Sequence, residues 1–325
     1  MNINELRKQF PDEKACRHFF ESLIWPSGRA CPHCGSVQSW AIRSASVRDG
    51  LYQCGGCHLQ FTVTTKTPLH STKLPLWTWL LAMYLMANSS KGISSVVLSR
   101  LVGTTQKTAW KVGHAIRALM ASAAVEATLL QGTVELDEKY LGGAPRFQQG
   151  VKHKRGKGTS KQCIAVAVER EGTVRATLVA HDGETALRPF VEAAVDPAAY
   201  LMSDHNPAYV KIAEGFAGHS FVDHGAREYV RDEVHNNTAE SFNSILERAK
   251  IGVFHSLSKE HMQRYVDEVA FRWNQRVAVD RITKKGRKKT VMKALPVIDK
   301  IANLLSAAFN VQIRWTPFGS IRAIA

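Results

Sequence analysis

The sequence predicts an α+β protein of several domains, in which a cysteine-bearing ribbon and a helical segment precede a mixed α/β domain. Three observations lead to this prediction. The chain has 325 residues, more than one compact domain usually holds. Four of its cysteines form two closely spaced pairs near the N-terminus. After residue 130, short alternating apolar runs replace the helical periodicity of the preceding residues.

Composition limits the class of partner. Hydrophobic residues make up 45% of the chain, enough to bury a core, so bulk disorder is not expected. Lys and Arg outnumber Asp and Glu by 43 to 28, which gives a formal net charge of +15. Such a charge favours a polyanionic partner, nucleic acid first and an anionic membrane surface second.

The sequence gives no sign of export or membrane insertion. The N-terminal residues MNINELRKQFPDEK lack the apolar stretch of a signal peptide. The longest apolar run, Leu74 to Met86, is well short of the roughly 20 residues that a spanning helix needs. We therefore expect a cytoplasmic, nucleoid-associated protein with no membrane partner. In a reducing compartment, cysteines are better explained by metal binding than by disulfides.

The two cysteine pairs follow a short helix expected over residues 4–25 and ended by Pro26 and Gly28. Each pair has CxxC spacing, and 19 residues separate the pairs. This pattern predicts a zinc ribbon, with the intervening residues forming hairpin strands. Four thiolates fill a tetrahedral shell, so the zinc is expected to be structural; a redox dithiol is the alternative. The predicted ligands are Cys31, Cys34, Cys54 and Cys57.

A helical segment follows the ribbon. Residues 75–88 predict a buried helix. Residues 93–101, a Gly103-Thr-Thr turn and residues 106–120 predict a helix-turn-helix. The last helix repeats apolar residues at helical spacing and leaves basic ones mostly on the other side, which suits DNA phosphates or base edges. An ordinary amphipathic helix with a solvated basic face is the alternative. The expected DNA contacts are Lys107, Lys111, His114 and Arg117.

The run TVELDEKYLGG, at residues 133–143, predicts a strand that carries Asp137 and ends at a Gly-Gly break. One such aspartate alone is most simply a solvated residue, so any catalytic role depends on partners. The next segment, residues 148–161, is strongly basic and predicts a loop. Lys154 and Arg155 within it are candidate contacts to a nucleic-acid backbone, with a solvated loop as the alternative.

Two further carboxylates follow in a regular succession. Residues 163–170 and 173–180 predict a hairpin, residues 184–194 a helix, and residues 200–203 a strand that ends on Asp204. Residues 235–250 predict a helix with Glu240 on its polar side. The order strand Asp, hairpin, helix, strand Asp, helix Glu is the ribonuclease-H-like arrangement.

The combined motifs resemble insertion-sequence transposases of the DDE superfamily, within which the zinc-ribbon group is the best match (insertion-sequence family fifteen-ninety-five, ISXO-type). Beside the two CxxC pairs, the resemblance rests on VELDEKYLGG at 134–143, SDHNPAY at 203–209, HNNTAESF at 235–242 and GVFHSLSKEHMQRYVDEVAFRWNQR at 252–276. It implies a Mg²⁺-dependent recombinase that cuts at the inverted ends of its element, with double-stranded DNA as partner and no small-molecule substrate. The mechanism implies a homo-oligomer on paired ends.

The resemblance carries Asp137, Asp204 and Glu240 over as the metal-binding triad. The chemistry agrees, because two hard cations about 4 Å apart can activate the attacking oxygen and stabilise the leaving oxygen of a phosphodiester. Mg²⁺ prefers carboxylate ligands and retains several waters, so three protein carboxylates suffice. Asn237 is a minor rival to Glu240, because some relatives use Asn as third ligand. Glu135 shares a strand face with Asp137 and is a weaker rival.

One position departs from the family pattern. The family commonly has a Lys seven residues after the acidic helix position, and this chain has Glu247 there. Arg248 or Lys250 could supply the missing cation, or strand handling differs. Asn237 and His235 match family positions and are candidate DNA or supporting contacts.

The sequence thus predicts four parts: a helix and zinc ribbon at 1–72, a helix-turn-helix region at 73–125, a ribonuclease-H-like domain at 126–280, and a basic extension at 281–325 that includes KKGRKK. Two alternatives remain at this stage. One is a DNA-binding regulator with an inactive catalytic fold, and the other is a nuclease that cuts without joining.

Overall fold

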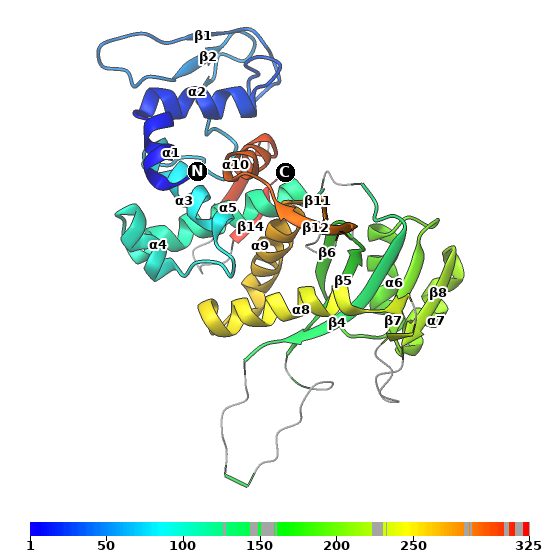
Figure 1. Cartoon of the computed structure of the whole chain (residues 1–325). Helices are drawn as coiled ribbons and strands as arrows, with labels where there is room; N and C mark the ends of the chain where they lie inside the picture. The colour runs from blue at the N-terminus through cyan, green and yellow to red at the C-terminus, as the bar shows by residue number, and fades with distance from the viewer. Residues whose placement is uncertain are drawn as a thin grey trace. The chain divides into compact units, whose positions relative to one another are not determined.

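The computed structural model describes most of the chain and divides it into two compact units (Figure 1). The first unit comprises residues 1–126 and 295–325, and the second comprises 127–294. Lys154 and Arg155 of the predicted basic loop lie outside the described residues, which are 1–125, 128–143, 149–150, 159, 161–222, 230–231, 233–282, 286, 288–308, 312–315 and 321–324.

The first unit begins with two helices where the sequence predicted one. These are α1 (Ile3–Gln9) and α2 (Glu13–Ile24). Pro11 interrupts the helical run, and the Asp12 carboxylate accepts a hydrogen bond from the Ala15 amide at 2.7 Å, which starts a new helix.

The cysteine-bearing ribbon is a three-stranded antiparallel sheet in the order β1-β2-β3. Its strands are short: β1 (Ser39–Ala41), β2 (Tyr52–Cys54) and β3 (Gln60–Phe61). The aromatic rings of Trp25, Tyr52 and Phe61 pack together with centroids 5.8–5.9 Å apart. So small an apolar core supplies little of the stability that a domain needs.

Helices form the rest of the first unit: α3 (Leu76–Asn88), α4 (Ser95–Val102), α5 (Gln106–Val125) and α10 (Val297–Ser306). The predicted helix-turn-helix is present as α4 and α5. Gly103 ends α4 in the left-handed region (φ 68°), where a glycine avoids the strain of a side chain. A two-stranded sheet of β13 (Gln312–Trp315) and β14 (Ile321–Ile324) lies near the C-terminus. None of the helices in the described residues is both long and apolar enough to cross a membrane.

The second unit is built on a five-stranded sheet in the order β6-β5-β4-β7-β8. Its strands are β4 (Thr133–Leu141), β5 (Gln162–Glu169), β6 (Val174–Val179), β7 (Tyr200–Asp204) and β8 (Gly218–Val222). The first three strands are antiparallel, whereas β4, β7 and β8 are parallel. An antiparallel meander followed by two parallel strands, each reached through a helix, is the ribonuclease-H-like arrangement, which confirms the predicted fold class.

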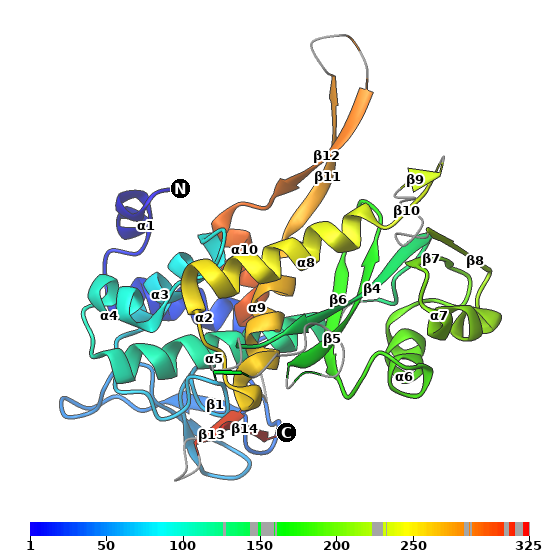
Figure 2. The same ribbon diagram turned by 90° about the horizontal axis from the view of Figure 1, so that it is seen from below.

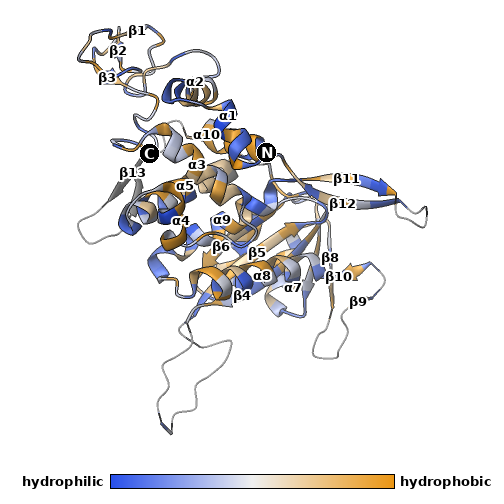
Figure 3. Cartoon of the chain, turned by 60° about the vertical axis from the view of Figure 1, so that its left-hand side comes forward, coloured by the Kyte–Doolittle hydropathy of each residue, from blue (hydrophilic) through white to orange (hydrophobic). Residues whose placement is uncertain are grey.

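Helices cover both faces of this sheet (Figure 2). On one face α6 (Glu184–Ala194) and α7 (Pro207–Ile212) pack on a core that includes Val134 and Leu136 of β4. On the other face α8 (Asn237–Ala249) and α9 (Met262–Asn274) pack on Ile164, Val166 and Val168 of β5. Figure 3 shows the sheet strands largely in the hydrophobic colour, as expected for a sheet buried on both sides.

Several short elements complete the second unit. A small sheet pairs β9 (Val230–Arg231) with β10 (Val234–His235) ahead of α8, and α8 continues into one π-helical stretch at Lys250–Phe254. After α9, strands β11 (Arg276–Ile282) and β12 (Lys288–Ala294) form a two-stranded ribbon. The sequence predicted no strand there, because β pairing depends on partners that a local pattern does not identify. The four-part domain division stays a prediction.

Candidate active site and metal centre

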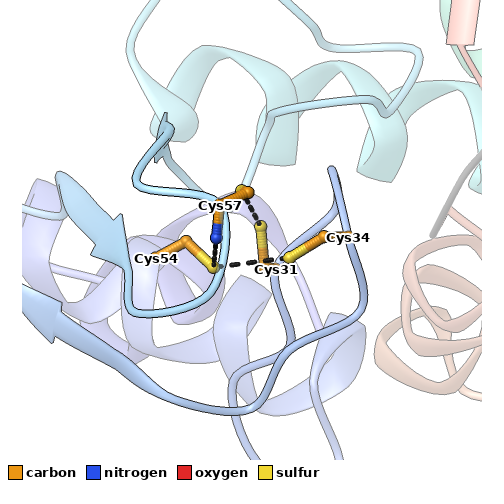
Figure 4. Close-up of side chains that lie close together, drawn as sticks. All are labelled: Cys31, Cys34, Cys54 and Cys57. Carbon is orange, nitrogen blue, oxygen red and sulfur yellow. Dashed lines mark hydrogen bonds between the residues drawn. The ribbon is translucent and has the colours of Figure 1, made fainter.

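The four cysteines of the ribbon lie together (Figure 4). The Sγ atoms of Cys31 and Cys57 are 3.7 Å apart, and those of Cys34 and Cys54 are 3.5 Å apart. All four lie within 4.8 Å of one another. Zn–S bonds of about 2.3 Å at tetrahedral angles put neighbouring sulfurs about 3.8 Å apart. The site therefore fits a structural zinc ion, as the sequence predicted.

Backbone amides support the thiolates. The amides of Gly56 and Cys57 donate to Cys54 Sγ at 3.3 and 3.5 Å, and the His33 amide donates to Cys31 Sγ at 3.4 Å. The hydrogen bond from the Cys57 amide is the largest cause that lowers the pKa of Cys54, to about 6. These hydrogen bonds stabilise the charged form of Cys54, which is the form that binds metal.

In the second unit, Asp137 and Asp204 lie on neighbouring parallel strands. Leu136 of β4 pairs with Ser203 of β7, and the two aspartates are the next residues along their strands. Residues at equivalent positions of parallel strands point to the same face. Asp137 faces the α8 side, because its register partner Val166 belongs to the core under α8 and α9. The fold thus brings together two acids that are far apart in the sequence.

Helix α8 adds two polar side chains near this pair. Asn243, which is only 5% exposed, donates from Nδ2 to Asp137 Oδ2 at 2.7 Å. Glu240 lies one helical turn earlier and is exposed, and its charge is one of the causes that raise the pKa of Asp137. Among the described residues, the cysteines are the one group of potential ligands whose donor atoms all lie within 4.8 Å, so the three carboxylates are less tightly gathered.

The electrostatics of the pair are unusual for carboxylates. Burial is the main cause that raises the pKa of Asp137, to about 7, and the charge of Asp204 raises it further. The hydrogen bond from Asn243 opposes the shift. The site therefore contains more negative charge than its surroundings stabilise, which is typical of functional sites and of sites that bind cations.

Glu138 is a fourth carboxylate that the sequence reasoning missed. It points to the opposite face of β4 and accepts hydrogen bonds from Asn206 Nδ2 at 2.6 Å and from the Tyr209 hydroxyl at 2.8 Å. Burial and the charge of Asp204 raise the pKa of Glu138 to about 7. The signal available in the sequence was the adjacency of two acids in DEKY, together with the SDHNPAY motif that supplies both partners.

Glu135, the rival to Asp137, is fully occupied elsewhere. Its buried carboxylate accepts from the amides of Thr238 and Ala239 at 2.7 and 3.0 Å, and so caps the N-terminus of α8. It also pairs with Arg170 Nε at 2.7 Å. These contacts indicate a structural role that fixes the helix carrying Glu240. Asn236, the residue before α8, donates from Nδ2 to the Leu136 carbonyl at 3.0 Å.

Glu135→Gln is expected to lower the stability of the second unit by about 3 kcal/mol, because it leaves Arg170 without its buried counter-charge and weakens the cap. Chemical denaturation of wild type and variant measures the effect. Glu192→Gln, an exposed substitution on α6, is the control and is expected to change stability by less than about 0.5 kcal/mol. Equal effects of the two changes would contradict the structural role of Glu135.

Glu247 lies between two lysines. Its Oε2 is 3.7 Å from Lys139 Nζ, and its Oε1 is 3.2 Å from Lys250 Nζ. Lys139 follows Asp137 by two residues on β4 and so shares its face. A cation therefore does lie on the same face as Asp137, and it is Lys139 of β4 and not a residue of α8.

On α5 the four predicted DNA contacts differ in exposure. Lys107 and Lys111 are exposed, but His114 and Arg117 are buried, with exposed fractions of 0% and 4%. Residues 112–117 are all buried. Six consecutive residues go round more than one helical turn, so this part of α5 has no solvent-exposed face, unlike an amphipathic surface helix. The Arg117 guanidinium lies over Gly113, where a Cβ would meet its Nη1 at 3.2 Å. His114 and Arg117 are therefore withdrawn from the predicted contacts.

The remaining predicted contacts lie on or beside α8. Asn237 is exposed at the first position of α8, and it lines a pocket with Ser241 and Trp273, away from Asp137. Arg248 is exposed, whereas Lys250 is half-buried against Glu247. His235 Nδ1 lies 3.3 Å from Glu135 Oε1, so it belongs to the group that supports the start of α8.

Comparison with known proteins gives two domain matches in the chain. Residues 11–60 match the transposase zinc-ribbon domain, and residues 129–274 match the ISXO2-like transposase domain. A protein of Halobacterium salinarum described as an uncharacterized protein in transposable element ISH50 is 26% identical over 273 residues, which are 80% of this chain and 90% of that protein.

Two solved structures give much weaker likenesses. The Mos1 strand transfer complex is 11% identical with a TM-score of 0.20, over 56% of this chain and 72% of that chain. The Mos1 mariner paired end complex with Mn is 10% identical with a TM-score of 0.21, over 57% and 73%. Scores this low carry no structural argument. The two domain matches agree with the cysteine site and the sheet topology, and the chain combines a transposase zinc-ribbon domain with an ISXO2-like transposase domain.

Proposed function

We propose that this transposase binds the terminal inverted repeats of its element, cleaves the DNA to free 3′-hydroxyl ends, and joins those ends to target DNA. Asp137, Asp204 and Glu240 are the catalytic carboxylates of this proposal. The observation that carries it is the position of Asp137 and Asp204 side by side on β4 and β7, under a helix whose Glu240 adds charge to the same site.

The residues fit a pair of divalent cations, which we take to be Mg²⁺. All candidate ligands are hard oxygen donors, which Mg²⁺ prefers. Burial and then the charge of Asp204 raise the pKa of Asp137, and a cation would offset both effects. Beside Asp137, the buried Asn243 Oδ1 has no hydrogen-bond partner among the described residues. When bound, such ions activate the attacking oxygen and stabilise the leaving oxygen of the phosphodiester. A divalent cation held by the three carboxylates would offset the repulsion among their charges.

The chain's own residues position these carboxylates. Asn243 orients Asp137 through its 2.7 Å hydrogen bond. Glu135 fixes the start of α8 and therefore the direction in which Glu240 projects. On the other face, Asn206 and Tyr209 hold Glu138, whose charge acts on the same site from behind the strand. Catalysis of this kind depends on such prior positioning, because the phosphoryl group itself forms no bond to the protein.

The proposed chemistry predicts a dependence of stability on pH. Asp137 and Glu138 have folded-state pKa values of about 7, above their ordinary values of 3.8 and 4.5, so the folded protein holds protons more tightly than the unfolded chain. Their contribution is present at acidic pH and is lost as pH rises through about 7. We expect the melting temperature of the metal-free protein to fall between about pH 6 and 8.

Millimolar Mg²⁺ is expected to restore more of this stability at pH 8 than at pH 6, because protons no longer compete for the carboxylates. Asp137→Asn is the control and should reduce the pH dependence to the part that comes from Glu138. If wild type and this variant melt with the same pH profile, the electrostatic description of the site is wrong.

Lys139 supplies, in this proposal, the cation that the family carries on the helix at the position of Glu247. Lys139→Ala is expected to weaken cleavage of element DNA about 10- to 100-fold, the loss of one charge-assisted contact to phosphate. Glu247→Lys in the Lys139→Ala background is expected to recover most of it, because it returns a cation to the same place. Lys211→Ala, which removes an exposed lysine from α7, serves as control. If Glu247→Lys does not restore cleavage in the Lys139→Ala background, Lys139 does not take the place of the family's helix lysine.

The proposed DNA contacts include three exposed cations, which are Lys107 and Lys111 on α5 and Arg248 on α8. The exposed Asn237 on α8 and the half-buried Lys250 just after α8 are further candidates, and Lys154 and Arg155 are kept from the sequence. Two element ends must be brought together before joining, so we expect at least a dimer on paired ends.

The zinc is expected to stabilise the fold of the ribbon without taking part in the reaction.

The decisive experiment is strand transfer with purified protein, Mg²⁺ and a labelled terminal inverted repeat. We expect cleavage at the 3′ end followed by a joined product. Cleavage without joining would make the protein a nuclease, and binding without cleavage would make it a regulator; either outcome overturns the proposal.

A further inference from the structure

The β11–β12 ribbon lies beyond the segment that matches the transposase domain, which ends at residue 274. It stands clear of the five-stranded sheet of its own unit (Figure 2). Most of its residues are exposed on both faces, including Val277, Val279 and Ile282 at 44%, 39% and 70%. An isolated two-stranded ribbon is only marginally stable in water, so a partner bound to one of its faces would stabilise it.

The register of the ribbon gives its two faces different chemistry. One face carries Val277 opposite Lys293, Val279 opposite Val291, and Arg281 opposite Lys289. We call these six residues the cationic face, since it contains three cations and three valines and no acid. The other face carries two cations and one acid, since Ile282 lies opposite Lys288 and Arg276 lies opposite Ala294. Between them Ala278 lies opposite Met292, and Asp280 accepts a hydrogen bond from Thr290 Oγ1 at 3.3 Å.

The cationic face includes an unfavourable pair. Arg281 and Lys289 lie directly opposite each other, and like charges at opposed positions destabilise a strand pair. An anion lying against this face removes that cost. The sequence of residues 276–294 contains eight Lys and Arg and one Asp, a net +7 out of the chain's +15. The partner is therefore strongly anionic.

The root of the ribbon is fixed. Arg276 Nε donates to the Trp273 carbonyl at 2.8 Å, and its guanidinium lies over the Trp273 ring at 3.7 Å from the centroid. Trp273 in turn contacts Phe242 of α8, edge-on with centroids 5.5 Å apart. The ribbon is thus anchored at its root to the α8–α9 pair of the second unit.

We propose that the cationic face of the ribbon is a DNA-binding surface that enters the major groove of the duplex. The major groove admits a two-stranded ribbon, with cations directed to the phosphates and valine methyl groups to the base edges. A second copy of this chain is the less favourable occupant, because two such faces would bring like charges together. The inference rests on the proposed function only in taking DNA as the partner.

The first test measures binding of the full-length, zinc-loaded chain to a duplex of arbitrary sequence by fluorescence anisotropy over a range of salt, without added Mg²⁺ so that cleavage does not occur. Arg281→Ala, Lys289→Ala and Lys293→Ala combined should weaken binding and reduce the slope of log K against log salt by roughly 2 to 3, the value for three lost phosphate contacts. The control removes three exposed lysines elsewhere, Lys8, Lys211 and Lys259. It should change the slope by less than one.

Equal effects of the two triple variants, or no effect of the ribbon variant, would overturn the proposal. So would a change of oligomeric state by light scattering with the salt slope intact, since the occupant would then be a second copy. Melting curves verify that both variants fold.

The second test addresses the face itself. Val279→Cys and Ala278→Cys place exposed thiols on adjacent residues that point to opposite faces of β11. With a duplex carrying a thiol-tethered base, Val279→Cys is expected to cross-link several-fold faster than Ala278→Cys. Equal rates, or no cross-link at all, would contradict the assignment. These tests involve no cleavage, so their failure is distinguishable from a failure of strand transfer by the wild type.

Discussion

Asp204→Asn is expected to reduce cleavage of element DNA by on the order of 10³-fold while the protein remains folded and bound to DNA. The amide keeps the shape of the side chain and removes its charge, and with it a ligand for a divalent cation. It also removes a charge that raises the pKa values of Asp137 and Glu138. The measurement is single-turnover cleavage of a labelled end with Mg²⁺, alongside a DNA-binding assay.

The same cleavage experiment tests whether Glu240 is a catalytic carboxylate or an ordinary solvated glutamate. Glu240→Gln should cause a loss comparable to that of Asp204→Asn, whereas Glu192→Gln, a matched exposed glutamate on α6, should retain full activity. Asn237→Ala tests the rival third ligand and should retain cleavage within about tenfold, the loss of one ordinary contact. If Glu240→Gln keeps full activity and Asn237→Ala does not, the third ligand has been assigned to the wrong residue.

Loss of the zinc is expected to unfold the ribbon. Its apolar core is essentially three aromatic rings, too little to fold alone, whereas a structural zinc in a small domain contributes about 10 kcal/mol or more. Cys54→Ser, or treatment with a strong chelator, should abolish the melting transition of residues 26–74 and release one zinc per chain. Zinc content by atomic emission and amide-proton dispersion by NMR measure this.

Cys163→Ala is the matched control for loss of a thiol. Cys163 lies on β5, outside the metal site, and its removal should leave the zinc content unchanged. Retention of one zinc by Cys54→Ser, or an unaltered ribbon after chelation, would refute a structural metal. The second unit should keep its own melting transition in either case, because its core is formed by the five-stranded sheet and the helices α6, α7, α8 and α9.

The sequence by itself determined much of this protein. Cysteine spacing was enough for the zinc site, because four thiolates at that spacing close on one tetrahedral ion. The alternation of residues 133–141 determined that Glu135 and Asp137 share a face, and the order of elements determined the sheet topology. Local signals such as Asp12 and Gly103 explain where helices begin and end.

Only the tertiary structure decided which residue on a shared face has which environment. Glu135 and Asp137 look alike in the sequence, but the start of α8 lies against one and Asn243 against the other. His114 and Arg117 are polar at positions that helical periodicity alone assigns to solvent, and only packing around α5 shows them buried. Lys139 on β4 meets Glu247 on α8. Such contacts depend on segments distant in the chain, and a local sequence pattern contains no information about their distance.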